Sequence, residues 1–189
     1  MNKEYYHTKE SVEEYINLAR DISGIKLIHK FQSFLPKESK LLEIGSGPGT
    51  DWKILSENYN VTGSDLSKEF LSHLKNHFPK GNFIELDAIS LDTSKKFDAI
   101  YSNKVLHHLK DEELVKSIKR QYEILTRGGI ICNSFWKGKG TEVFKGMFVN
   151  YQNQETLRSF FEPKFEILLL EEYKEFEDGD SILLIGKKV

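Results

Sequence analysis

The sequence lacks the features that mark secreted and membrane proteins. A single cysteine, Cys132, stands among 189 residues, so no internal disulfide can form and a reducing compartment is indicated. No apolar run approaches the roughly 20 residues that a transmembrane helix needs. The first segment, 1–7, is polar and has no signal-peptide pattern. We therefore expect a cytoplasmic protein without a membrane partner.

An excess of charge of one sign is also absent. The chain has 27 Lys and Arg residues against 29 Asp and Glu residues, which gives a net charge of −2 at pH 7. Because proteins that bind nucleic acid generally carry basic surfaces, no nucleic-acid partner is expected. The chain has no repeats and no low-complexity tracts. At this length the sequence predicts a single domain over 1–189 with one substantial core.

The N-terminal part of the chain predicts two helices. Apolar residues recur at helical spacing between Val12 and Ile22, and a second helical pattern stops at Pro36. We expect this helical segment, 1–36, to cap a site on the core of the domain, 37–189.

After Pro36, short apolar runs alternate with helical patterns, an order that is typical of an α/β sheet with parallel strands. The runs that predict buried strands occupy 41–45, 61–65, 83–87, 97–102 and 130–136. The helical patterns begin near Thr50, after Ser67 as N-cap, at Asp111 as N-cap with Arg127-Gly128-Gly129 at the far end, and near 153.

The last two strand-like runs, 165–173 and 181–187, are joined by only seven residues. This connection is too short to cross over a sheet, so the two strands must pair antiparallel as an edge hairpin. The predicted fold class is therefore α/β, a doubly wound sheet of seven strands. The sheet is mostly parallel, with helices on both faces and the antiparallel hairpin at the C-terminal end.

A glycine stands at every second position from Gly45 to Gly49, directly after a predicted strand. Glycine permits positive φ and a close approach to bare backbone, and a helix that begins at Thr50 points free N–H groups at the same place. Dinucleotide-binding loops read G-x-G-x-x-G, with a third glycine where this chain has Thr50. The loop predicts a site for a nucleoside cofactor, and a simple tight turn is the alternative.

Acidic residues end two of the predicted strands, at the edge of the sheet where doubly wound folds bind ligands. Asp65 stands twenty residues after Gly45, and its carboxylate can accept hydrogen bonds from both hydroxyls of a ribose. Asp87 can accept from an exocyclic amine such as that of adenine. A capping or loop role for Asp65 and a solvated position for Asp87 are the alternatives.

These motifs together resemble class I S-adenosylmethionine-dependent methyltransferases, in particular small-molecule members with little beyond the Rossmann-like core. The similarity runs from about Ser39 to the C-terminus and is carried by Leu41 to Gly49, Asp65-Leu66-Ser67, 97–109 and Arg127-Gly128-Gly129. The resemblance implies S-adenosyl-L-methionine as cofactor. It also implies methyl transfer to a small-molecule acceptor.

The resemblance assigns the glycine loop to the cofactor. Gly45, Ser46 and Gly47 would lie against it, and Glu43 would support the loop or the methionine amino group.

The strand ends complete the cofactor site that the resemblance implies. Asp65 would hold the ribose and Asp87 the adenine amine. Leu66 and Ala88 would flank the adenine, and the backbone at Asn103 would lie beside the methionine part.

The implied reaction is an in-line displacement at the methyl group, which the protein promotes mainly by positioning. A general base is optional, so no catalytic residue is assigned, and His107 and His108 are the candidates. Their alternative is a structural role in the loop after the fourth strand. Adjacent histidines point in different directions on regular backbone, so no metal is expected.

Residues outside the nucleotide half should select the acceptor. The candidates are Tyr5, Tyr6, His107, Trp136 and Tyr151, with ordinary packing as the alternative for each. Two other functions stay open: a protein or RNA methyltransferase, and a non-catalytic S-adenosylmethionine-binding regulatory protein. The sequence predicts neither the acceptor atom nor the oligomeric state.

Overall fold

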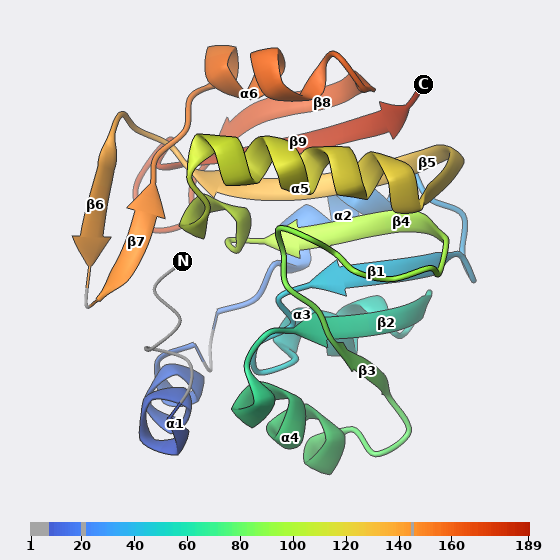
Figure 1. Ribbon diagram of the computed structural model, residues 1–189, viewed down its shortest axis with the longest axis vertical. Coiled ribbons are helices and arrows are strands. Elements are labelled where there is room, and N and C mark those ends of the chain that lie inside the picture. The colour runs from blue at the N-terminus through green and yellow to red at the C-terminus, as the bar shows by residue number, and fades with distance from the viewer. Residues whose placement is uncertain (1–7, 20–21, 145) are drawn as a thin grey trace.

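The computed structural model describes residues 8–19, 22–144 and 146–189, and its centre is a seven-stranded sheet (Figure 1). The strands follow the order β3-β2-β1-β4-β5-β9-β8. Their bounds are β1 Lys40–Ile44, β2 Asn60–Asp65, β3 Asn82–Glu85, β4 Phe97–Asn103, β5 Leu125–Trp136, β8 Phe165–Tyr173 and β9 Ser181–Lys188. Strands β1 to β5 run parallel, and β9 lies antiparallel between β5 and β8. The predicted doubly wound sheet and its terminal hairpin are confirmed.

Helices cover both faces of this sheet. Their bounds are α1 Lys9–Leu18, α2 Ile25–Gln32, α3 Thr50–Leu55, α4 Lys68–His77, α5 Asp111–Ile124 and α6 Gln154–Phe161. Because adjacent residues of a strand point to opposite faces, Leu41 shares a core with α2 and α3, whereas Leu42 shares one with α5 and α6. Both leucines are fully buried, which explains why the central strands are continuously apolar.

Both ends of α5 differ from the prediction. Lys110 is the N-cap, with its backbone N–H donating to the Glu113 carboxylate at 3.0 Å, and Asp111 is the first helical residue. The Asp111 carboxylate accepts from the side-chain amide of Asn150 at 2.8 Å. At its other end the helix stops early, so Arg127-Gly128-Gly129 lies within β5. A shift in the β4–β5 register after Phe97 accommodates these residues. The predicted N-cap of α4 is confirmed, since the Ser67 hydroxyl accepts from a backbone N–H of the first turn.

An antiparallel hairpin of β6 Thr141–Phe144 and β7 Met147–Asn150 forms a second, small sheet where the sequence indicates a loop. Figure 1 shows it beside the carboxyl ends of β4 and β5. The side-chain amide of Asn150 donates to the backbone carbonyl of Leu109 at 3.0 Å, which ties β7 to the segment before α5. The hairpin therefore has a fixed position next to the edge where ligands bind.

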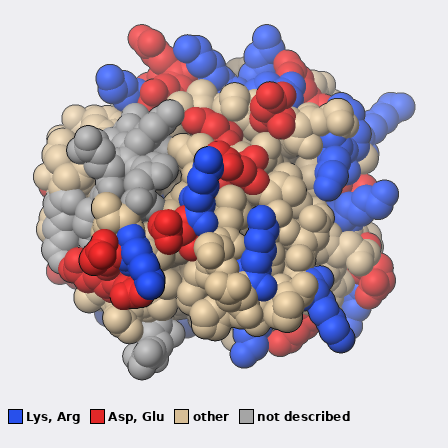
Figure 2. All heavy atoms as spheres, turned by 60° about the horizontal axis from the view of Figure 1, so that its bottom comes forward, with Lys and Arg blue, Asp and Glu red and all other residues tan. Residues whose placement is uncertain are grey.

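Charged side chains of both signs are mixed on the surface. On the face in Figure 2, Lys and Arg are interspersed with Asp and Glu, in keeping with the net charge of −2. Among the helices that the structure describes, none has the length and apolar character to cross a membrane.

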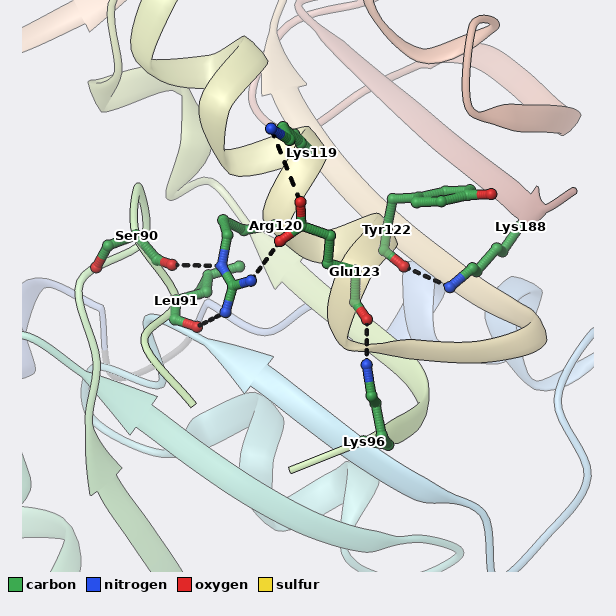
Figure 3. A network of polar contacts seen from close by, with 8 residues as sticks. All are labelled: Ser90, Leu91, Lys96, Lys119, Arg120, Tyr122, Glu123 and Lys188. Atoms are coloured by element: carbon green, nitrogen blue, oxygen red, sulfur yellow. Dashed lines mark hydrogen bonds and ion pairs between the residues drawn. The ribbon is translucent and has the colours of Figure 1, made fainter. Parts of the chain in front are cut away.

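The loop between β3 and β4 is fixed to α5 by Arg120 (Figure 3). Its Nε donates to the carbonyl of Ser90 at 2.9 Å and its Nη2 to that of Leu91 at 3.1 Å, while Glu123 pairs with the same guanidinium. This loop also carries Ala88, one of the predicted cofactor residues. The network therefore fixes one wall of the site described next.

Candidate active site

A cavity of about 470 Å³ opens at the carboxyl ends of β1, β2 and β4. It lies where the strand order reverses between β1 and β4, the position at which doubly wound sheets bind ligands. The loop after β1 and the start of α4 form one part of its wall, and α1, the β6–β7 hairpin and the β8–β9 loop form the other.

The glycine loop lies bare against this cavity. Gly45 and Gly47 have φ of 69° and 48°, a region that favours glycine. A Cβ on Gly45 would stand 2.4 Å from Val105 Cγ2, so this glycine is required by packing. A Cβ on Gly47 would meet nothing within 4 Å, although Gly47 lines the cavity. The space beside Gly47 is therefore a cradle that a bound group can enter.

Asp65 joins this loop to the next helix. Its Oδ2 accepts from the backbone N–H of Gly47 at 3.0 Å, and its Oδ1 accepts from that of Ser67 at 2.9 Å. The carboxylate thus has the local loop role considered above and also lines the cavity. Two carboxylate oxygens offer about four acceptor sites, so both roles are compatible.

Glu43 is buried beneath the loop with 2% of its surface exposed. The Ser46 hydroxyl donates to its Oε2 at 2.5 Å. Burial raises the pKa of Glu43 to about 8, the Ser46 hydrogen bond lowers it, and the charges of Asp51 and Asp65 raise it further. The side chain is therefore mostly protonated at neutral pH.

Asp51, in the first turn of α3, is a cavity residue that the sequence analysis missed. Its Oδ2 accepts from the Tyr101 hydroxyl at 2.8 Å and from Asn103 Nδ2 at 2.9 Å, and its Oδ1 accepts from the N–H of Gly24 at 2.6 Å. Asn103 also accepts from the Ser134 hydroxyl at 2.6 Å. An acid two residues after Gly49 was the signal in the sequence, but its partners come from distant elements.

The residues predicted to surround adenine are placed differently. Leu66 and Ala88 line the cavity. Asp87 is not among the described residues that line it, and its Oδ1 accepts from the N–H of Ile89 at 2.7 Å. Asp87 thus stabilises the turn that carries Ala88.

The two histidines, in the 3₁₀ turn Leu106–His108, have different surroundings. His107 is buried and is not among the described residues of the cavity wall, and burial holds its pKa well below the usual range. His108 lines the cavity, and its Nδ1 donates to the carbonyl of Phe148 at 2.7 Å. Burial lowers the pKa of His108, although this hydrogen bond opposes the shift. A neutral ring with its proton on Nδ1 makes Nε2 the basic nitrogen.

Of the predicted acceptor residues, Trp136 lines the cavity. Tyr151 is not among the described residues of the cavity wall. Its hydroxyl donates to Glu142 on the hairpin. Tyr5 and Tyr6 lie outside the described residues. Phe148 and Phe176 are wall residues that the sequence analysis missed.

Lys104, directly after β4, was also missed. Its φ is 54°, its Nζ lies 3.5 Å from the centre of the Trp136 ring, and it donates to Phe135 O at 3.0 Å and to Ser181 Oγ at 2.6 Å. Burial lowers the pKa of Lys104 to about 7, while the charges of Glu175 and Asp180 oppose the shift. Lys104 thus connects the end of β4 to the hairpin of β8 and β9.

Metal ligands are not clustered in the part of the chain that the structure describes: no group of three or more His, Cys, Asp or Glu side chains there could hold an ion.

Comparison with known proteins relates part of the chain to methyltransferases. Residues 41–129 match the family model described as "Methyltransferase domain". This segment of the chain resembles a methyltransferase domain. An uncharacterized methyltransferase of Bacillus cytotoxicus is 34% identical over 93 residues, which cover 48% of this chain and 44% of that protein. The chain spans between 36% and 67% of the length of three curated relatives.

Solved methyltransferase structures share the whole fold. A Clostridium acetobutylicum S-adenosylmethionine-dependent methyltransferase has a TM-score of 0.76 and 16% identity, covering 95% of this chain and 98% of its own. The Burkholderia thailandensis 1,6-didemethyltoxoflavin-N1-methyltransferase has a TM-score of 0.80 and 17% identity, covering 95% of this chain and 84% of its own. The chain therefore has the predicted Rossmann-like fold, which these methyltransferases share.

Proposed function

We propose that this chain transfers the methyl group of S-adenosylmethionine to a small-molecule acceptor. The observation that carries the proposal is the cradle beside Gly47, which opens into the same cavity as the Asp65 carboxylate. The family match supports it, as does the Burkholderia relative, which was solved with S-adenosylhomocysteine and a small-molecule substrate bound. We also infer that residues 1–189 act as one domain and that α1 covers the site, since Tyr15 and Leu18 line the cavity.

The wall residues fit this cofactor. Gly47 and its neighbours offer bare backbone, and Asp65 can accept from the ribose hydroxyls. Leu66 and Ala88 provide apolar contacts for the adenine. The bound cofactor supplies a methyl group on a positively charged sulfur, so the protein has to align the acceptor and exclude water.

The methionine part has its own candidates in the same wall. Glu43 lies under the loop, and the backbone at Asn103 ends β4 beside it. We keep Asp87 as a candidate for the adenine amine through its position next to Ala88, although its Oδ1 already accepts from its own loop.

His108 is the better of the two candidate bases. It lines the cavity, and its donation to Phe148 directs the basic Nε2 away from the backbone of β7. The burial of His107 outside the described cavity wall suits a packing role.

Calorimetry with S-adenosylhomocysteine tests the cofactor site. We expect binding by the intact chain, and Asp65→Ala should weaken it at least about tenfold because buried polar groups lose a partner. Asp98→Ala is the matched control: Asp98 accepts from the N–H of Lys40 at 3.0 Å, at the opposite edge of the sheet. The affinity of the Asp98→Ala protein for S-adenosylhomocysteine should stay unchanged. No binding by the intact chain would refute the proposal.

Transfer itself is measured with tritiated S-adenosylmethionine in a cell extract that is then divided into macromolecules and small molecules. Label in the small-molecule fraction supports the proposal. Label confined to macromolecules favours a protein or RNA methyltransferase, and tight binding without release of S-adenosylhomocysteine favours a regulatory protein.

A further inference from the structure

We propose that the acceptor half of the cavity binds a planar aromatic or heteroaromatic molecule that carries no negative charge. This inference rests on the proposed function and specifies its substrate class.

The wall of the acceptor half is aromatic. Trp136 ends β5, Phe144 and Phe148 come from the hairpin, and Phe176 comes from the β8–β9 loop. These segments lie beyond the carboxyl ends of the strands, so they are the parts of the fold that can differ without changing the cofactor site. Apolar walls with a few polar groups are typical of small-molecule sites.

Two of these rings are largely exposed. Phe144 is 56% exposed and Phe176 is 61% exposed, although both line the cavity. Exposed apolar surface beside a cavity is a candidate for cover by a ligand. An aromatic ligand would bury both rings.

The rings also favour a flat ligand. The planes of Trp136 and Phe176 differ by only 19°, with 5.8 Å between ring centres. The two rings therefore stack on each other, and a planar molecule can extend this stack on the exposed side of Phe176, where such stacking contributes about 0.5–1.5 kcal/mol per pair beyond area burial. A saturated ring is thicker and has no π-system, so it loses this contribution.

The charges of the wall disfavour an anion. Three acidic residues, Asp51, Asp65 and Glu175, line the cavity beside the mostly protonated Glu43, and Lys104 is the only lysine or arginine among its described wall residues. The Lys104 ammonium group already donates to Phe135 O and Ser181 Oγ and lies over the Trp136 ring. A carboxylate or phosphate on the acceptor would therefore meet acidic groups, and the described wall offers no further lysine or arginine to pair with it.

The position of His108 fits a ring N–H or a phenolic O–H as acceptor. Its Nδ1 is held by the carbonyl of Phe148, whose own ring belongs to the aromatic wall. In the transfer, the acceptor nitrogen or oxygen forms the bond to the methyl carbon, and the electron pair of the broken carbon–sulfur bond stays on sulfur. The acceptor proton passes to Nε2 of His108.

Three matched probes test the inference on the full chain saturated with S-adenosylhomocysteine: 2-naphthol, 6-hydroxy-2-naphthoate and decahydro-2-naphthol. Calorimetry should show binding of 2-naphthol, with the anionic and the saturated probes each at least tenfold weaker. Equal or tighter binding of either one, or no binding of 2-naphthol, overturns the inference. Binding of S-adenosylhomocysteine is measured separately. If it binds, a negative result with the probes overturns only this inference and the proposed function stands. If it does not bind, the proposed function is refuted.

A pair of variants locates the probe. Phe176→Ala should weaken 2-naphthol binding about 3- to 10-fold, the loss expected for one aromatic contact, and leave the affinity for S-adenosylhomocysteine unchanged. Phe34→Ala removes the same side chain at a position that is 36% exposed and outside the described cavity wall, so it should alter neither affinity. An unchanged 2-naphthol affinity in Phe176→Ala contradicts the proposed binding position.

Discussion

At the scale of single residues, Gly47 gives the sharpest test of the cofactor cradle. Gly47→Ala should weaken binding of S-adenosylhomocysteine at least tenfold, because its Cβ would occupy cavity space that has no protein atom within 4 Å. Positive φ also makes alanine unfavourable here by about 1–2 kcal/mol. Calorimetry measures the affinity, and urea denaturation measures the stability.

Gly140→Ala separates these two effects. Gly140 has a φ of 77° and no atom within 4 Å of a Cβ, but it is not among the described residues of the cavity wall. The two variants should therefore lose similar stability, while only Gly47→Ala loses affinity. Equal affinities for the two variants would mean that the cofactor does not lie against Gly47.

The residues that the sequence could reveal are those whose role depends on local position. Asp65 follows a strand and a glycine loop in the sequence, so its place at the cavity was predictable. Lys104 was not, since a lysine after a strand normally indicates a solvated side chain. It is half-buried, with a left-handed backbone conformation and contacts to Trp136 and Ser181, which are distant in the sequence.

At the scale of elements, the buried strands were predictable because both of their faces are apolar. The β6–β7 hairpin has no such pattern: Val143 is 69% exposed and Phe144 is 56% exposed, and the hairpin does not join the main sheet. Its position depends on contacts such as that of Asn150 with Leu109, which no local periodicity encodes. The acceptor side of the site was therefore the part that the sequence predicted least well.

Asp180 holds the β8–β9 loop, which leads to a prediction about this element. Its carboxylate accepts from the N–H groups of Glu175, Phe176 and Glu177 at 2.8–2.9 Å. Partial burial raises the pKa of Asp180, but these hydrogen bonds outweigh it and lower the pKa to about 2. Asp180→Ala should make hydrogen exchange at residues 175–177 at least tenfold faster, as measured by mass spectrometry.

Asp178→Ala is the control for this loop. The side chain of Asp178 is 92% exposed, and its carboxylate pairs with Lys174 at 3.0 Å. Exposed ion pairs of this kind contribute little, so exchange in the loop should stay as in the unchanged chain. Protection that persists in Asp180→Ala would show that the loop is held by something other than this carboxylate.

At the scale of the whole molecule, Glu43 links stability to pH. Because burial raises its pKa from 4.5 to about 8, the folded chain keeps a proton that the unfolded chain releases between these values. The contribution of Glu43 to stability is therefore fully present below pH 4.5 and is lost as the pH rises toward 8. Glu43→Gln removes this titration, so without cofactor it should be more stable than the unchanged chain at pH 8, by on the order of 4 kcal/mol.

Urea denaturation at pH 5, 6.5 and 8 measures this difference. At pH 5 the two proteins should be close in stability, since Glu43 is neutral there and glutamine can still accept from Ser46. Glu57→Gln changes an exposed glutamate and should keep the pH dependence of the unchanged chain. If Glu43→Gln loses stability with rising pH as steeply as Glu57→Gln does, the buried carboxyl under the glycine loop is not the group that titrates.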